Sequence, residues 1–372
     1  MTGGDVFYLG SYTTGNGGTG EGITAARRDP DTGALSPLGV VAKTDAPSFL
    51  AHHPALPAVY AVSEVSDGAV SAWAVEPDGA LRPLGSRPTG GAHPCHLAAV
   101  SGVGPGEREE RGEAEPRSEA EPRSRERKMM QLVVANYGSG SVAVHPLDGD
   151  GAVGERADLV EHRGHGPNRE RQERAHAHMV SPDPDGRHVR VVDLGADAIY
   201  RYALDGGRLR AAAPQLRTRP GTGPRHIARG PDGWLYVAGE LDATVTAFRP
   251  DPDGGELVEA ARVASTGHEG LTYPSEIAVD PTGSHLYVAN RGPDTIAVFA
   301  LTDGHPRYVT EVATGGRWPR HFALYDGFLY VANERSHAVV TFQVAPSTGI
   351  PVATGAVLEV PSPTCVLPPI RR

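Results

Sequence analysis

Arginine, glutamate and histidine residues recur at two fixed points of a repeated sequence pattern. Guanidinium groups bind carboxylates and phosphates through paired hydrogen bonds, and histidine or glutamate side chains can move protons in a reaction. Together they suit general acid–base chemistry on a small anionic substrate, provided that the fold brings them together. The residues concerned are His176, Arg225, Glu240, Arg291, Arg320 and Glu334.

The repeat that carries these residues consists of three short strands joined by tight turns. In residues 224–249, PRHIA is a strand, GPDG is a turn, and WLYVAGE and TVTAFR are two further strands. Glycine and aspartate supply the turns, and β-branched and aromatic residues supply the strands. Residues 274–299 and 319–342 repeat this pattern. A spacing of about 44 to 50 residues between most copies predicts a β-propeller in which each repeat is one blade.

Two positions of the repeat form columns when its copies are aligned. The first column lies six residues before the turn proline, where that proline is visible, and contains Ser48, Cys95, His176, Arg225, Ser275, Arg320 and Thr364. The second column follows the second strand and contains Tyr12, Glu64, Tyr137, Leu194, Glu240, Arg291 and Glu334. Since the first strand of each blade lines the central channel of a propeller, we expect both columns to converge at one mouth of that channel.

The two ends of the chain complete one further blade. Residues 363–366 match a first strand without the rest of its blade, and residues 7–12, 22–29 and 35–41 match the missing strands. Pairing of the terminal strands would close the ring and leave no open sheet edge. We therefore predict an all-β fold, a seven-bladed β-propeller closed by its N- and C-terminal strands, as a single domain over residues 1–372.

Two charged segments interrupt the repeat. Residues 105–128 mix acidic and basic side chains without an apolar period, which predicts a disordered insertion inside one blade. RNA or partner binding by the arginines of this segment is an alternative, although its charges nearly cancel. Residues 161–178 lead directly into a first-column position, so their arginine and histidine side chains could fold over the channel mouth.

The candidate residues also have structural interpretations. The arginines could tie blades together through carboxylates, the glutamates could cap turns, and His226 and His321 are expected to form hydrogen bonds inside the blades. His176 and His178 form an H-x-H pair on an extended strand, so they should point to opposite faces, and the pattern does not show which of them faces the channel. A metal site would need both on one face with further ligands, so none is predicted.

Sequence signatures of other chemistries are absent. The chain has no phosphate-binding P-loop, no dinucleotide-binding pattern and no G-x-S-x-G nucleophile elbow. Neither cysteine has an evident activating partner in the sequence. We therefore predict no cofactor.

The composition of the chain disfavours nucleic-acid binding, a membrane span and a disulfide-stabilised fold. A formal net charge of −10 disfavours nucleic acid as a partner, and no apolar run is long enough to predict a membrane span. The start MTGGDVFYLGSY lacks a leader pattern, and two cysteines cannot form a disulfide framework. We expect a cytoplasmic monomer or weak homo-oligomer whose partner is a small anionic substrate.

The chain resembles, over nearly its whole length, the seven-bladed propeller lactonases of the 6-phosphogluconolactonase type, which are related to carboxy-muconate lactonising enzymes. The resemblance rests on the order of FYLGSYT, PSFLAHHP, VANYGSGSV, AHAHMVSPDPDG, GPRHIA, VAGELDATV, LYVANRGPDTIAVF and LYVANERS. GPNRERQERAHAH is similar to the stretch GP-x-x-x-RQ-x-x-PHxH of the Gram-positive branch, with Ala175 in place of the proline.

The resemblance implies hydrolysis of a sugar-acid lactone, with 6-phosphoglucono-1,5-lactone as the first expectation. The catalytic residues that it implies are His176, Arg225, Glu240 and Arg291. His176 or Glu240 would activate a water molecule, and the two arginines would hold the oxyanion and the anionic group of the substrate. Further substrate contacts are expected from Tyr137, His178, Arg320 and Glu334. A muconate-type lactonising cycloisomerase and a non-enzymatic binding scaffold are the alternatives.

Overall fold

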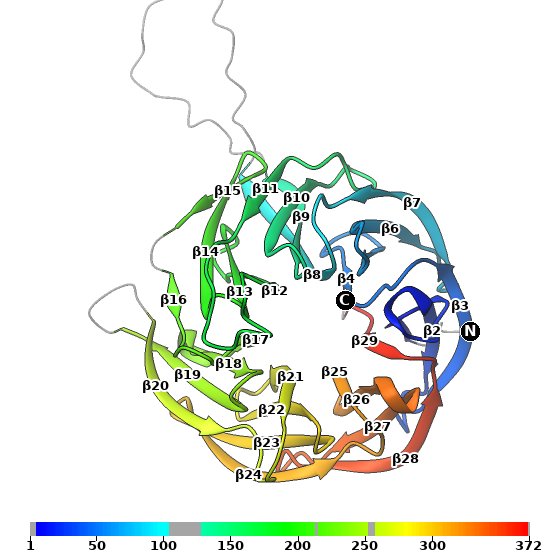
Figure 1. Cartoon of the computed structure of the whole chain (residues 1–372). Coiled ribbons are helices and arrows are strands. Elements are labelled where there is room, and N and C mark those ends of the chain that lie inside the picture. The colour runs from blue at the N-terminus through cyan, green and yellow to red at the C-terminus, as the bar shows by residue number, and fades with distance from the viewer. Residues whose placement is uncertain (1–4, 104–127, 213–214, 252–256, 371–372) are drawn as a thin grey trace, which may run out of the picture.

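The computed structural model describes residues 5–103, 128–212, 215–251 and 257–370, which form five four-stranded sheets and one nine-stranded sheet. The nine-stranded sheet consists of two blades joined by one parallel pair, Val103 with Asp205. The described residues therefore form seven blades arranged in a ring (Figure 1), and the predicted fold is confirmed. The predicted insertion lies outside the described residues, apart from Lys128, which begins a strand.

The blades are numbered along the chain, and their strands are given from the inner to the outer edge. Blade 1 contains β29 (Pro363–Leu367), β1 (Val6–Ser11), β2 (Gly22–Arg28) and β3 (Leu35–Lys43). Blade 2 contains β4 (Leu50–His52), β5 (Ala58–Ser63), β6 (Ala69–Val75) and β7 (Leu81–Pro88). Blade 3 contains β8 (Pro94–Val103), β9 (Lys128–Asn136), β10 (Ser141–Pro146) and β11 (Asp158–Glu161).

Blade 4 has a divided outer edge, and the last three blades are regular. Blade 4 contains β12 (Ala177–Pro182), β13 (His188–Asp193), β14 (Ala198–Asp205), β15 (Arg208–Ala211) and β16 (Leu216–Arg217). Blade 5 contains β17 (Pro224–Arg229), β18 (Leu235–Gly239), β19 (Thr244–Pro250) and β20 (Leu257–Ala264). Blade 6 contains β21 (Tyr273–Val279), β22 (His285–Arg291), β23 (Thr295–Thr302) and β24 (His305–Ala313). Blade 7 contains β25 (Pro319–Tyr325), β26 (Phe328–Asn333), β27 (Ala338–Val344) and β28 (Pro351–Glu359).

Helical structure in the described residues is limited to three short 3-10 turns. These are η1 (Thr14–Asn16), η2 (Pro231–Gly233) and η3 (Glu334–Ser336). None of the described helices has the length and apolar content needed to cross a bilayer.

The ring closes through the two ends of the chain, as predicted. In blade 1, β29 pairs with β1 in antiparallel register, with Val366 opposite Leu9 and Leu367 opposite Tyr8. Figure 1 shows β29, in red, on the inner side of the blue N-terminal strands. The inner strand of this blade therefore comes from one end of the chain and its other strands from the opposite end.

Buried tyrosines of the second strands connect neighbouring blades. Each hydroxyl group donates a hydrogen bond to a glycine carbonyl in the outer hairpin of the next blade, at 2.7 to 3.0 Å. Those glycines have positive φ angles of 67 to 91°, which tight hairpins require and glycine adopts without strain. The pairs are Tyr8 with Gly79, Tyr60 with Gly151, Tyr236 with Gly304, and Tyr287 with Gly349. These four tyrosines thus connect neighbouring blades of the ring.

β-bulges at the start of the inner strands aim the first-column side chains. In β17 the pairing shifts between Pro224 and His226, so Arg225 is the extra, unpaired residue. The same shift makes Arg320 the bulged residue of β25. In β12 the shift lies between Ala177 and Met179, which makes His178 the equivalent residue.

The prediction that His176 occupies the first column is therefore wrong. The sequence SPDPDG holds two prolines, and Pro182 still pairs within β12. The turn proline is Pro184, and His178 lies six residues before it, as Arg225 lies six residues before Pro231. The bulge also brings both histidine rings against Tyr137, at centroid distances of 4.5 Å for His176 and 5.6 Å for His178. The expected separation of the two rings onto opposite faces does not occur.

Candidate active site

The two columns meet at one end of the ring, which we call the site face. Inner strands begin where second strands end, since Pro224 pairs with Gly239 and Pro319 with Asn333. Side chains that open an inner strand and side chains that follow a second strand therefore share this face. All eight predicted site residues lie here: Tyr137, His176, His178, Arg225, Glu240, Arg291, Arg320 and Glu334.

Glu240 is the centre of the predicted catalytic group. Its Oε2 atom lies 2.7 Å from Nη2 of Arg291 and 3.2 Å from Nε of Arg225. Its Oε1 atom accepts a hydrogen bond of 2.5 Å from Nη2 of Arg171. Arg225 also donates to the carbonyl of Ser275 at 2.7 Å. One carboxylate thus holds three guanidinium groups, from blades 5 and 6 and from the segment between blades 3 and 4.

Only one of these three arginines is open to solvent. The side chain of Arg171 is 37 % exposed, whereas those of Arg225, Arg291 and Glu240 are 4 to 6 % exposed. Burial alone would raise the pKa of Glu240, but Arg291, Arg225 and Arg171 lower it to about 2. Burial, with Arg291 and Arg320, lowers the pKa of Arg225 to about 10. Glu240 is therefore a fixed carboxylate, and the group around it carries an excess of positive charge.

His176 lies beside this group and is oriented by Tyr137. Its Nδ1 atom lies 2.9 Å from the carbonyl oxygen of Tyr137, which can only accept, so Nδ1 carries a proton. Its Nε2 atom lies 3.1 Å from Oε2 of Glu173. The backbone N–H of His176 donates to the buried Asp193 at 2.8 Å. Because Tyr137 also receives a hydrogen bond of 3.4 Å from Arg171, it links the imidazole to the arginine group.

Arg320 and Glu334 form a second group with two residues from other blades. Nη2 of Arg320 donates to the hydroxyl of Tyr12, and its guanidinium carbon lies 4.7 Å from the centre of that ring. Glu64 and Glu334 each lie 3.9 Å from Arg320, and Tyr12 donates to Glu64 at 3.0 Å. Burial raises the pKa of Tyr12 well above its usual value, although Arg320 opposes this. This group has more carboxylates than arginines, the reverse of the group around Glu240.

Histidines of the inner strands form a buried layer below these two groups. His226 and His321 contact the same oxygen of Glu276, at 3.1 and 3.2 Å. The ring of His226 also lies 5.4 Å from that of His96 and 5.2 Å from that of His178. Burial lowers the pKa of all four histidines, to about 4 for His321. The expectation that His226 and His321 form hydrogen bonds inside their own blades is therefore wrong, because both contact Glu276 of blade 6 from the neighbouring blades. The lowered pKa values keep these histidines neutral.

The segment before β12 supplies two site residues that the sequence did not single out, Arg171 and Glu173. Its anchor is Gln172, which is fully buried and donates from Nε2 to the carbonyl of Leu194 at 2.9 Å. The side-chain oxygen of Asn168 accepts from the N–H of Arg171 at 3.2 Å and shapes the turn. The expectation that charged residues of 161–178 reach the channel mouth is correct for Arg171. Its position depends on these long-range contacts, which no local pattern shows.

The site face offers acid–base groups rather than a covalent nucleophile. Cys95 is buried, and burial raises the pKa of its thiol far above the usual value. In the described part of the chain, the group with metal-like spacing is Asp183, Asp185 and His188. It lies at the other end of the ring, where arginines already bind Asp183 at 3.1 and 2.7 Å, so its residues do not fit a metal ion well.

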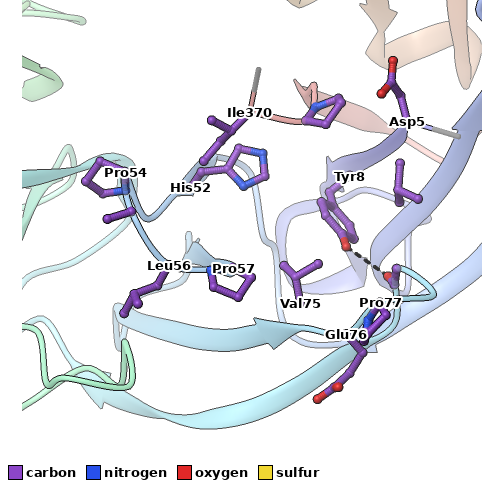
Figure 2. Close-up of a pocket in the computed structure, with 14 residues that line it drawn as sticks. Asp5, Tyr8, His52, Pro54, Leu56, Pro57, Val75, Glu76, Pro77 and Ile370 are labelled. Carbon is purple, nitrogen blue, oxygen red and sulfur yellow. Dashed lines mark hydrogen bonds between the residues drawn. The ribbon is translucent and has the colours of Figure 1, made fainter. Parts of the chain in front are cut away.

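The pocket drawn in Figure 2 also lies at that other end. It has a volume of about 700 Å³, and the segment before β5, the β6–β7 hairpin and Ile370 line it. Tyr8 donates to the carbonyl of Gly79 in its wall at 3.0 Å. None of the eight predicted site residues lines this pocket.

Comparisons with known proteins match the whole ring. The family described as "Lactonase, 7-bladed beta-propeller" matches residues 6–103 and 122–368. The gap in this match, residues 104–121, overlaps the predicted insertion 105–128. The chain is 32 % identical over 371 residues to the 6-phosphogluconolactonase of Bacillus subtilis, covering 97 % of each chain.

Two solved structures have a similar fold over nearly the whole chain and a sequence identity to it of 28 %. The periplasmic gluconolactonase of Pseudomonas aeruginosa has a TM-score of 0.82 and 28 % identity, with 98 % of each chain covered. A Lactobacillus plantarum protein has a TM-score of 0.84 and 28 % identity, with 98 % of this chain and 99 % of that chain covered.

Proposed function

Since the chain belongs to the family of seven-bladed β-propeller lactonases and is itself a lactonase, we propose that its substrate is 6-phosphoglucono-1,5-lactone. The product of this hydrolysis is 6-phosphogluconate. The observation that carries the proposal is the group of three arginines on one carboxylate beside His176. Such a group suits a substrate that is anionic before the reaction and gains a second negative charge at its carbonyl during it.

The proposed reaction begins at His176. In this structure both ring nitrogens face acceptor oxygens, so the reaction requires Glu173 to turn away from Nε2. The neutral ring, with its proton on Nδ1, then takes a proton from water through Nε2 as the water oxygen attacks the lactone carbonyl carbon. Glu173 Oε2, at 3.1 Å, then accepts a hydrogen bond from the Nε2–H of the imidazolium. Glu240 is a poor base because its pKa is about 2, so we assign it the role of holding the arginines.

The arginines stabilise the negative charges of the reaction. Attack converts the carbonyl oxygen to an oxyanion, which the positive charge of Arg225 and Arg291 stabilises. Arg171, with its exposed guanidinium, binds the phosphate of the substrate. When the ring C–O bond breaks, His176 returns its proton to the leaving oxygen, and the product is a hydroxy acid. Tyr12, Glu64 and Glu334 provide hydrogen-bonding partners for sugar hydroxyl groups.

A lactone hydrolysis assay tests this proposal. The pH-stat rate is measured with phosphorylated and unphosphorylated gluconolactone for the wild type and for Arg225→Ala. We expect catalysis well above the spontaneous rate, a higher kcat/KM for the phosphorylated lactone, and a decrease of about 100-fold in the variant without unfolding.

The matched control is Arg249→Ala, which removes an exposed arginine of β19, the third strand of blade 5, and should leave the rate unchanged. No catalysis of either lactone would contradict the proposed reaction and favour the cycloisomerase or scaffold alternatives. Equal kcat/KM for both lactones would contradict phosphate recognition alone. Unchanged turnover in a folded Arg225→Ala variant would remove this residue from the site.

We further propose a cytoplasmic location, a monomer or weak homo-oligomer, and no nucleic-acid or membrane partner. The acidic net charge of −10 supports the absence of a nucleic-acid partner. Cell fractionation and size-exclusion chromatography with light scattering test it, and recovery in a periplasmic fraction would contradict the location.

A further inference from the structure

Trp318 has a backbone conformation that bulky residues rarely adopt. Its φ angle of 64° lies in the left-handed region, where glycine is favoured and a large side chain is strained. It directly precedes β25, an inner strand of the ring (Figure 1). Strained residues cluster at ligand sites, where the surrounding structure holds them in place. A tryptophan at this strained position therefore indicates a role for its side chain.

The fold requires this conformation but does not require this side chain. The residue before the proline that leads into or opens the inner strand also has a positive φ angle in four other blades. These residues are Ala46 (39°), His93 (50°), Gly223 (56°) and Ser362 (43°). Most of them are small, and blade 5 has the unstrained choice, glycine. A tryptophan in blade 7 is the bulkiest of these side chains, so its contacts must account for it.

Those contacts include two residues of the candidate site, Arg291 and Glu334. The guanidinium carbon of Arg335 lies 3.5 Å from the centre of the Trp318 ring, and that of Arg291 lies 5.5 Å away. The ring of Tyr273, whose carbonyl accepts from Nε of Arg291, is 6.1 Å away. The backbone of Trp318 donates to Asp294 at 2.8 Å and accepts from the N–H of Glu334 at 3.1 Å. The ring thus contacts two guanidinium groups, one of which is that of Arg291.

The apolar core does not explain the ring. Trp73 belongs to a core cluster, and Trp234 packs against another. Among the described residues, none of the core clusters includes Trp318, which is half-buried on the site face. Arg335 covers part of the ring at 3.5 Å, and the part that remains exposed is available to a ligand bound next to Arg291.

We propose that Trp318 is a substrate-contacting residue that forms the wall of the lactone site at blade 7. Its ring packs against the C–H face of the lactone ring, a contact that aromatic side chains make with sugars. Through its cation–π contact it also fixes Arg291, which lies 2.7 Å from Glu240. The inference rests on the proposed function and adds the residue that recognises the shape of the sugar ring.

Substitution by glycine separates binding from folding. Trp318→Gly relieves the backbone strain while removing the ring, so the variant should remain folded. We expect kcat/KM for the phosphorylated lactone to fall about tenfold, mainly through KM. Trp318→Phe, which keeps a flat ring, should stay within about threefold of the wild type. The matched control Ala46→Gly makes the same backbone change in blade 2, away from Arg291, and should leave KM unchanged.

Kinetics that do not change would overturn the proposal. If Trp318→Gly stays within twofold of the wild type, or if Ala46→Gly raises KM equally, the ring does not contact substrate. These results leave the proposed function intact, because the wild type would still hydrolyse the lactone.

A binding measurement keeps the two proposals separate. Tryptophan fluorescence is titrated with 6-phosphogluconate in the wild type and in Trp318→Phe, where Trp73 and Trp234 remain. We expect a saturable change that is lost in the variant, even if the wild type hydrolyses neither lactone. No change in the wild type, or the same change in both proteins, would overturn the role of Trp318.

Discussion

Glu240 holds three guanidinium groups with two oxygen atoms. Burial of four charged groups is costly unless they are paired, and here the exposed Arg171 keeps one side of the group in contact with solvent. The excess of positive charge is available to a ligand because the carboxylate cannot neutralise all three arginines. This is the electrostatic basis of the proposed anion binding.

For individual residues, the sequence was sufficient to identify those site residues that lie at the ends of strands. Glu240 and Arg291 lie at the ends of strands with a strong sequence pattern, so their positions in the repeat were sufficient to predict that they lie at the site. Arg171 and Glu173 lie in a segment without periodicity, and only the contacts of the buried Gln172 bring them to the site. His176 was expected at the site for the wrong reason, since a turn with two prolines shifted the alignment.

The buried histidine layer predicts a loss of stability on acidification. Burial lowers the pKa of His321 to about 4 although Glu276 opposes this, and His226 and Arg225 add to the lowering. The unfolded residue has a pKa of about 6.5. Since the unfolded chain binds the proton more readily, this contribution to the free energy of unfolding is complete above about pH 6.5 and disappears by about pH 4.

Urea unfolding of the wild type and of His321→Gln between pH 7 and pH 4.5 measures this effect. The variant should be less stable at pH 7 and show a shallower decline, whereas His165→Gln, at an exposed position, should follow the wild type. An equally steep decline in His321→Gln would show that His321 does not contribute.

At the scale of the element, the β-bulges of the inner strands matter most. Each bulge places one residue outside the pairing and aims it at the site, as for Arg225, Arg320 and His178. The repeat predicted where the strands begin, because proline and the apolar alternation mark them. It did not predict the bulges, since an extra residue is visible only in the pairing with the next strand.

The segment that carries Arg171 depends on one amide side chain, so we expect Gln172→Ala to release it. The change removes the hydrogen bond to Leu194 and leaves that carbonyl unpaired, which should lower the free energy of unfolding by about 1 to 3 kcal/mol. Lactone kcat/KM should fall about tenfold or more, because Arg171 and Glu173 lose their positions.

Hydrogen exchange of residues 163–175 follows the release directly and should become faster in the variant. Gln343→Ala, at an exposed position of β27, is the matched control. Slow exchange in this segment with normal activity would show that other contacts hold it.

At the scale of the whole molecule, the tyrosine contacts make neighbouring blades interdependent. We expect Tyr287→Phe, which removes only the hydroxyl group bound to Gly349 at 2.7 Å, to lower the free energy of unfolding by about 1 kcal/mol. Tyr308→Phe alters an exposed tyrosine that bonds within its own blade, and it should change stability far less. Urea unfolding compares the two, and equal effects would contradict a special role of the contact between blades.

The number of blades and the closure of the ring were predictable because the strand and turn residues are recognisable within each repeat. The pattern also anticipated that the two chain ends share a blade, and β29 pairs with β1. The contacts between blades were not predictable, although a tyrosine recurs in the second strands that make four of them. Partners separated by 62 to 91 residues leave no local signal.

Translation separates the two strands of the closing pair in time. Val6 and Pro363 are 357 positions apart, so a ribosome that adds about 5 to 20 residues per second makes β29 roughly 20 to 70 seconds after β1. During that interval the inner edge of β1 has no partner from its own chain, and an unpaired strand edge can accept a strand from a neighbouring nascent chain. Polysomes, which hold many such chains close together, are therefore the setting in which this ring is most exposed to misassembly.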